Sequence, residues 1–261
     1  MELKNLLYEK RDYIGIVKFN RPKQLNAIDS DTAMEIVELF DAMDKDSDIR
    51  CVILTGEGER AFSAGGDIRE EAEKTVLMAY DFIKLGTKAL SSVENFRAPV
   101  IAAINGYCLG AGTEFALCCD IRLAAENAKL GSPEVTLGLL PGWGGTQRLP
   151  RIIGISKAKE FIFTGDKYTA QQSYEMGLVD RIVPADALLD EAIALAEKIA
   201  SRPPMAINYI KTLINDGMQC DLQRALRMEG AMAVHLFETQ DNKEACAAFL
   251  EKRPHKEFIG K

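Results

Sequence analysis

The sequence is poor in the residue types on which many catalytic and metal-binding motifs depend. Only two histidines occur among 261 residues, His235 and His255, and neither has a nucleophile motif beside it. The six cysteines contain no Cys-x-x-Cys pair, and most of them follow apolar neighbours. These absences argue against a zinc finger and against Ser-His-Asp or Cys-His catalysis, and we expect no metal site.

An excess of positive charge and long apolar runs are also missing. Lys and Arg number 32 against 39 Asp and Glu, a net charge of −7, whereas a general nucleic-acid binder carries a basic domain or stripe. The longest apolar run, over 100–104, is too short to cross a bilayer. The first ten residues lack the apolar stretch of a secretory signal. We therefore expect a soluble protein of a reducing compartment, the cytoplasm, with no nucleic-acid or membrane partner.

What the sequence does contain is a high apolar content arranged in alternating strand and helix patterns. Hydrophobic residues make up 47% of the chain, enough for a substantial core. Period-two and helical patterns predict strands over 14–19, 51–55 and 99–104 and helices over 30–43 and 76–95. Asp29 or Ser30 is the expected N-cap of the first helix. Such alternation is typical of an α/β fold.

The last third of the chain has a different character. After residue 185 nearly everything up to 252 predicts helix, in three segments separated by Pro203-Pro204 and Gly217. The segment over 222–237 is apolar around much of its circumference, so it must be buried somewhere. The sequence leaves open whether these helices pack on a core of their own or against another subunit. We divide the chain into a catalytic core over 1–185 and a helical region over 186–261.

Two glycine-rich stretches resemble nucleotide-binding motifs only superficially. The pattern over 56–61 has the spacing of a dinucleotide fingerprint, but Met78 stands where the ribose-binding acid is expected. The stretch over 142–148 lacks the Lys-Ser/Thr of a phosphate loop and is interpreted as a tight turn that opens a helix. The basic residues over 148–151 and 157–159 are expected on solvated faces.

Two other turns carry the features of a catalytic site. In the turns over 64–67 and 110–114, small residues let a backbone N–H approach a ligand, and the second turn opens a helix whose free donors favour an oxyanion. Glu114 lies on the same face of that helix turn as Ala111. Glu134 follows among Pro, Val, Leu and Gly, where partial desolvation raises a carboxyl pKa toward values useful in acid–base catalysis. Taken singly, each glutamate is better explained as an acid near a helix start, so the combination carries the argument.

The combination closely resembles the crotonase (enoyl-CoA hydratase/isomerase) superfamily. The segments that carry the resemblance are Asn20–Ala27, Ala64–Ile68, Asn105–Glu114, Pro133-Glu134 and Pro141–Leu149, and the likeness continues to Phe249–Arg253. It covers essentially the whole chain, and the set of motifs is specific.

The resemblance implies an α/β fold in which ββα units form a spiral, followed by a C-terminal helical trimerisation region. It implies a homotrimer, or a hexamer built as a dimer of trimers. The implied substrate is an acyl-CoA thioester, with no cofactor, because coenzyme A is part of the substrate.

The family's site residues map onto this chain position by position. The implied oxyanion hole is formed by the backbone N–H groups of Ala64 and Ala111. The implied catalytic pair is Glu114 and Glu134, which hold one water between them, and Gly142 matches a position near that water. The remaining positions implied to bind substrate or coenzyme A are Lys23, Leu25, Ala27, Ala64, Gly65, Gly66, Asp67, Ile68, Gly110, Gly142 and, from a neighbouring subunit, Lys252.

Three positions depart from the pattern of many hydratases. Ala111 replaces a glycine, which a backbone donor tolerates. Ser132 replaces a glutamine before the Pro-Glu pair. Trp143 is bulkier than its counterparts and is expected to shorten or reshape the acyl pocket.

The resemblance predicts an enoyl-CoA hydratase that acts reversibly on short 2-enoyl-CoA thioesters and is a 3-hydroxybutyryl-CoA dehydratase in reverse. The nearest alternative is an enoyl-CoA isomerase of the same fold, for which a single glutamate suffices. A non-catalytic or RNA-binding family member is the other alternative, and the acidic net charge counts against it.

Overall fold

The computed structural model describes residues 3–261 and contains two β-sheets of different size. The larger sheet has the strand order β1-β2-β3-β5-β7-β10 and the smaller one β4-β6-β8-β9. The strands are β1 (Leu6–Arg11), β2 (Ile14–Phe19), β3 (Cys51–Gly56), β4 (Ala61–Ser63), β5 (Val100–Ile104), β6 (Tyr107–Leu109), β7 (Ile121–Ala125), β8 (Lys129–Gly131), β9 (Lys167–Thr169) and β10 (Arg181–Val183). Only β1 with β2 and β8 with β9 pair antiparallel within these sheets.

The chain alternates between the two sheets in a repeated pattern. In the pairs β3/β4, β5/β6 and β7/β8, the first strand joins the larger sheet and the second joins the smaller one. Helix α3 (Val76–Glu94) and helix α4 (Ala111–Cys118) follow the first two pairs. The arrangement confirms the expected ββα units. Since β4, β6 and β8 are parallel neighbours, their carboxyl ends meet at one edge.

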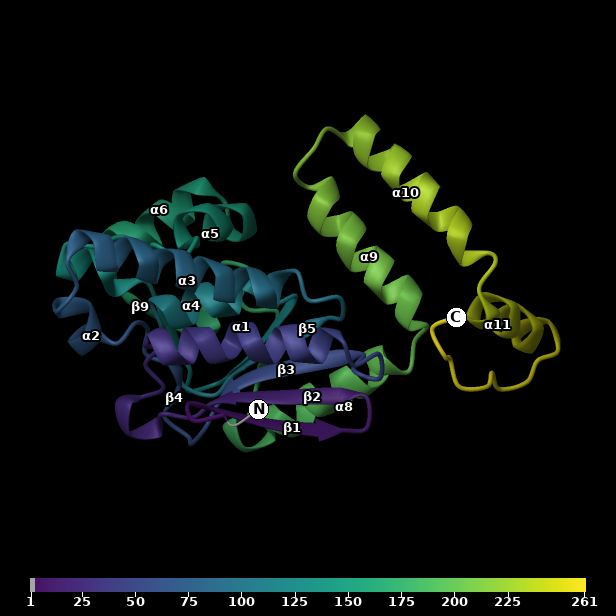
Figure 1. Ribbon diagram of the computed structural model, residues 1–261, viewed down its shortest axis with the longest axis horizontal. Coiled ribbons are helices and arrows are strands. Elements are labelled where there is room, and N and C mark those ends of the chain that lie inside the picture. Colours follow the sequence, from purple (N-terminus) through teal and green to yellow (C-terminus); the bar gives the residue numbers. More distant parts are fainter. Residues whose placement is uncertain (1–2) are drawn as a thin grey trace.

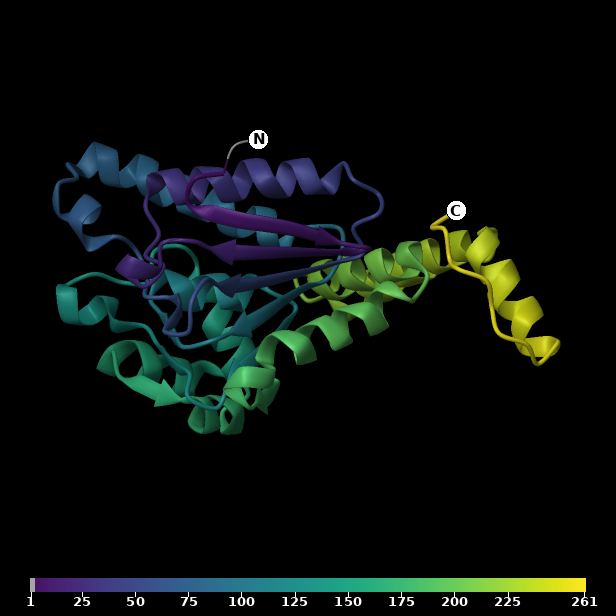
Figure 2. The same ribbon diagram turned by 90° about the horizontal axis from the view of Figure 1, so that it is seen from below.

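Helices cover both faces of the larger sheet (Figures 1 and 2). On one face, α1 (Ser30–Asp44) and α3 pack side by side over the main apolar core. On the other face, α8 (Leu188–Ala200) buries Leu188, Ala192 and Ala196 against the strands. The Asp29 side chain accepts the Thr32 N–H at 2.8 Å, so the predicted cap of α1 is confirmed.

The expected C-terminal region contains four helices, where the sequence analysis predicted three segments. After α8 come α9 (Pro204–Gly217), α10 (Leu222–Leu236) and α11 (Gln240–Leu250). A separate cap causes the extra break, because the Thr239 side chain accepts the Asn242 N–H and starts α11. The helices α9–α11 extend away from the sheets (Figure 1), whereas α8 packs on the larger sheet. The division at residue 185 therefore does not follow the packing of α8, and as a division into domains it stays a prediction.

The remaining helices are short or lie near the smaller sheet. They are η1 (Pro22–Gln24), α2 (Ile68–Ala72), η2 (Pro133–Leu137), α5 (Gly145–Ile153), α6 (Ile155–Thr164), α7 (Ala170–Glu175) and η3 (Ala185–Ala187). Over residues 3–261, no helix has both the length and the apolar character needed to cross a membrane.

Candidate active site

Three neighbouring strand ends gather the residues of the candidate site. The turn over 64–67 follows β4, Gly110 follows β6, and the Ser132–Glu134 segment follows β8. Because β6 pairs with both β4 and β8, these three turns lie side by side. Gly65 has φ +108° and Gly110 has φ +53°, conformations that favour glycine, and their backbones approach closely: a Cβ on Gly110 would lie 3.6 Å from Gly65 Cα.

A cavity of about 330 Å³ opens at this edge, and it collects most of the predicted site residues. Both glutamates line it, as do Ala64, Gly65, Gly66, Ile68, Gly110, Ala111 and Gly142. The rest of its wall comes from the segment over 71–83, which includes parts of α2 and α3, and from η2 and the residues after it: Glu71, Lys74, Ala79, Phe82, Ile83, Pro133, Leu137, Leu139, Leu140 and Trp143. Apart from Pro133 and Trp143, none of these wall residues belongs to a motif identified in the sequence. Their apolar spacing is that of ordinary core positions and gives no signal of a pocket.

The Glu114 carboxylate is buried and held from one side by the backbone. Its side chain comes from the first turn of α4, and the residue is 2% exposed. The N–H groups of Trp143 and Gly145 donate to Glu114 Oε1 at 2.8 and 2.7 Å. Two donors on one oxygen fix the orientation of the carboxylate and favour its ionised form.

The Glu134 carboxylate faces the same cavity without any such support. Both of its oxygens are buried and have no hydrogen-bond partner among residues 3–261. A Cβ placed on Gly110 would lie 3.2 Å from Glu134 Oε1, so this carboxylate lies beside the turn over 110–114. A buried carboxyl group without donors favours its protonated form.

Burial shifts the pKa of both carboxyl groups upward. Desolvation raises the pKa of Glu114 to about 7, against the opposing effect of the Gly145 and Trp143 N–H groups. Desolvation also raises the pKa of Glu134, and the negative charge of Glu71 adds to this. Elevated carboxyl pKa values in a cleft are typical of groups that exchange protons near neutral pH.

The structure contradicts the assignment of Ala64 as an oxyanion donor. The Ala64 N–H donates to the carbonyl of Leu25 at 2.9 Å, so it is not free to bind a ligand. The Gly65 N–H donates to Ser63 Oγ at 3.2 Å, and the Asp67 N–H to the Ile28 carbonyl at 2.9 Å.

The Gly66 N–H is left as the free donor of this turn. Neither it nor the Ala111 N–H donates a hydrogen bond to any of the described residues. Ala111 is the first residue of α4, where a helix leaves its N–H groups without partners. Two free backbone donors, at Gly66 and Ala111, thus line the cavity, where the sequence predicted donors at Ala64 and Ala111.

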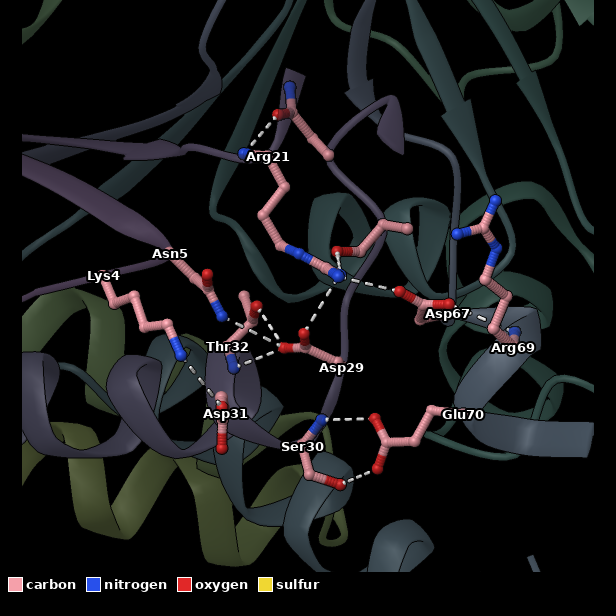
Figure 3. Close-up of polar contacts among 12 residues, drawn as sticks. Lys4, Asn5, Arg21, Asp29, Ser30, Asp31, Thr32, Asp67, Arg69 and Glu70 are labelled. Carbon is pink, nitrogen blue, oxygen red and sulfur yellow. Dashed lines mark hydrogen bonds and ion pairs between the residues drawn. The ribbon is translucent and has the colours of Figure 1, made fainter. Parts of the chain in front are cut away.

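Arg21 links the turn over 64–67, which we call the oxyanion turn because of its free Gly66 N–H, to the predicted coenzyme A segment (Figure 3). Its guanidinium donates to Asp67 Oδ2 at 2.9 Å and to the Ala27 carbonyl at 2.7 Å, and it lies 3.1 Å from Asp29 Oδ2. These bonds hold together a strand end, a turn and the N-cap of α1. Asp67 therefore positions the turn through Arg21, and it does not line the cavity.

The loop that supports Glu114 is held by an ion pair that the sequence analysis missed. Arg148 donates to both carboxylate oxygens of Glu94, at 2.9 and 2.6 Å, and to the Trp143 carbonyl at 3.0 Å. The expectation of a solvated Arg148 is wrong, because α5 turns this side chain back onto α3. The Trp143 ring is buried in space left by Gly86 and lies 5.0 Å from the Phe82 ring. Trp143 lines the cavity, as expected.

The predicted coenzyme A contacts lie outside the cavity. Lys23 is exposed on η1, and Leu25 and Ala27 are half-buried next to the oxyanion turn. Lys252 follows α11, which lies at the end of the molecule opposite α2 (Figure 1). A single copy of the chain therefore does not bring Lys252 to the site.

Comparison with known proteins assigns the class. The chain belongs to the enoyl-CoA hydratase/isomerase family, whose sequence profile matches residues 9–258. The short-chain-enoyl-CoA hydratase of Clostridium acetobutylicum is 45% identical over 253 residues, which is 97% of each chain. The crotonyl-CoA hydratase of Syntrophomonas wolfei subsp. wolfei is 42% identical over 253 residues, again 97% of each. A crystal structure of an enoyl-CoA hydratase from Bacillus anthracis, 40% identical, matches with a TM-score of 0.96 over 99% of this chain and 100% of that one. The crotonase-like fold is thereby confirmed.

Proposed function

We propose that this enzyme is an enoyl-CoA hydratase that adds water reversibly across the 2,3 double bond of a short-chain 2-enoyl-CoA. The observation that carries the proposal is one cavity that joins two buried carboxylates to two free backbone donors. The two hydratase relatives, similar over nearly the full chain, support the same reaction. The product is a 3-hydroxyacyl-CoA, and coenzyme A enters as part of the substrate.

The environments of the two carboxylates suggest separate roles. Glu114, whose charge is supported by the Trp143 and Gly145 N–H groups, takes a proton from the water as the water oxygen bonds to C3. The π electrons move toward the thioester, and the Gly66 and Ala111 N–H groups donate to the oxyanion that forms. Glu134, whose buried carboxyl oxygens have no hydrogen-bond partner among residues 3–261, delivers a proton to C2. Return of one proton from Glu114 to Glu134 restores the starting state.

The competing reactions predict different observations. An isomerase of this fold needs one carboxylate to move a proton between carbons, and the convergence of two on one cavity favours hydration. Mixing the enzyme with crotonyl-CoA tests the difference, because hydration removes the conjugated enoyl absorbance. An isomerase instead generates that absorbance from 3-butenoyl-CoA, and an RNA-binding protein leaves both substrates unchanged.

The fall of kcat/KM on the acid side of the pH profile is expected to follow the protonation of Glu114. The base must be ionised, and burial raises its pKa to about 7. We therefore expect kcat/KM for crotonyl-CoA to fall about tenfold per pH unit at pH values below about 7. The residual activity of Glu114→Gln should lack this fall. A wild-type profile that stays flat down to about pH 5 would contradict the role of Glu114.

We expect a homotrimer, or a hexamer built as a dimer of trimers. Helix α10 buries none of its residues within the chain, and Leu222, Val234 and Phe237 are 69%, 65% and 72% exposed. Large apolar side chains exposed along one helix in this way are typical of an interface. Mass measurement in solution should give three or six chains per particle, and Leu226→Glu on α10 should lower that number. A wild-type protein that is monomeric at micromolar concentration would contradict the assembly.

Cytoplasmic location and coenzyme A contacts by Lys23 and by a neighbouring Lys252 stay predictions.

A further inference from the structure

A third carboxylate faces the cavity, and the hydration scheme has no use for it. Glu71 projects from α2 back over the oxyanion turn, where a Cβ placed on Gly66 would lie 1.9 Å from Glu71 Oε1. The residue is half-buried and lines the cavity together with Glu114 and Glu134. Its carboxylate accepts no hydrogen bond from any of residues 3–261. A charged group in this position needs an explanation because the rest of the wall is mainly apolar.

The positively charged side chain of the cavity wall forms an ion pair with a carboxylate other than Glu71. Of the described residues that line the cavity, only Lys74 is positively charged. Its Nζ lies 2.6 Å from Glu70 Oε1 and 4.4 Å from the centre of the Phe82 ring. The negative charge of Glu71 is therefore not matched by an ion pair.

The position of Glu71 is fixed by its neighbours on α2. Glu70 Oε2 accepts the Ser30 N–H at 2.9 Å, which anchors α2 to the start of α1 (Figure 3). At the N-cap of α2, the Asp67 side chain accepts the Arg69 N–H at 3.1 Å while it also binds Arg21. These contacts hold the helix so that Glu71 faces the cavity.

The negative charge of Glu71 acts on other groups that line the cavity. The negative charge of Glu71 contributes to the raised pKa of Glu134, second in importance among the raising effects to desolvation. Two like unit charges about 7 Å apart, at an effective dielectric constant of about 20, weaken binding by more than tenfold. An acyl group that brought a second negative charge into this space would meet that repulsion.

We propose that Glu71 is a specificity-determining residue that excludes acyl groups ending in a carboxylate and reserves the pocket for neutral acyl chains. This inference rests on the proposed acyl-CoA substrate, and it adds a restriction on the acyl group that the hydration chemistry does not require.

The test compares two saturated thioesters of equal chain length, valeryl-CoA and glutaryl-CoA, which end in a methyl group and a carboxylate. Calorimetry measures the Kd of each for the wild type, Glu71→Gln, Glu71→Met and Glu73→Gln. Glu73→Gln is the matched control, since it removes the same charge from an exposed position next to α2 and outside the cavity. Crotonyl-CoA hydration is measured separately, so failure of the proposed function is seen independently of failure of this inference.

We expect the wild type to bind valeryl-CoA more tightly than glutaryl-CoA. Both Glu71 variants should lower the ratio of the glutaryl-CoA Kd to the valeryl-CoA Kd by at least about tenfold. Glu73→Gln should leave that ratio within twofold of the wild-type value. A ratio unchanged in Glu71→Gln and Glu71→Met would overturn the proposal. Equal or tighter binding of glutaryl-CoA by the wild type would also overturn it and would point to Lys74 as an anion-binding group.

Discussion

Glu114→Gln and Glu134→Gln are each expected to lower kcat for crotonyl-CoA hydration by at least about a hundredfold, with little change in KM. A general acid or base typically contributes about a hundred- to ten-thousand-fold. Gln keeps an oxygen that can accept the Trp143 and Gly145 N–H groups at position 114, so the loop geometry is retained. Because each residue transfers a proton in the transition state, Glu114 from the water and Glu134 to C2, the loss falls on kcat.

In the double variant, we expect the fold-loss in kcat to be far smaller than the product of the fold-losses of the two single variants. Both proton transfers belong to one reaction, so removal of either carboxylate already disables it and removal of the second adds little. Glu126→Gln, at an exposed turn position away from the cavity, is the matched control and should retain normal hydration. Binding of a saturated acyl-CoA should be measured for every variant. Near-normal hydration by Glu114→Gln together with an inactive Glu134→Gln would contradict the two-carboxylate scheme and favour a single-base isomerase.

Removal of the Ala111 donor is the second change with a large expected effect. A single oxyanion donor is worth about 3 kcal/mol, or roughly a hundred- to a thousand-fold in kcat. Ala111→Pro deletes this N–H at the first position of α4, where a helix tolerates proline, so the local fold should persist. We therefore expect Ala111→Pro to lose at least about a hundredfold in kcat.

Ala111→Gly is the matched control for this prediction, because it keeps the N–H and removes only a methyl group. It should retain most of the wild-type rate. Circular dichroism and thermal unfolding of both variants show whether the fold is retained. If Ala111→Pro is folded, binds acyl-CoA and turns over at the wild-type rate, the assignment of the Ala111 N–H to the oxyanion hole is wrong.

The side chains of the site were easier to predict from the sequence than the backbone N–H groups that are free to bind a ligand. The alternation of strands and helices and the cap at Asp29 follow from local patterns, whereas the ββα units and the meeting of Glu114 with Glu134 follow from the family resemblance. The structure shows the cap and places both glutamates on one cavity. The first oxyanion donor was misassigned because the availability of an N–H depends on a carbonyl far away in sequence. Leu25 supplies that carbonyl for Ala64, and no local feature of the turn indicates it.

Charged residues were predicted less well for a related reason. Glu71 occurs in a stretch that is rich in charge and Arg148 follows a polar turn, so a solvated surface is the simplest expectation for both. Their positions depend on how α5 and α2 pack on other elements, which brings Arg148 to Glu94 and Glu71 to the cavity.

The most direct test of the central claim is the reaction of crotonyl-CoA in water enriched in heavy oxygen, followed by mass spectrometry of the product. The account predicts loss of the enoyl absorbance and formation of 3-hydroxybutyryl-CoA that carries one solvent oxygen at C3, at a rate at least about a hundredfold greater than that of Glu134→Gln. Unchanged crotonyl-CoA with no incorporated oxygen, from an enzyme that still converts 3-butenoyl-CoA to crotonyl-CoA, would contradict it.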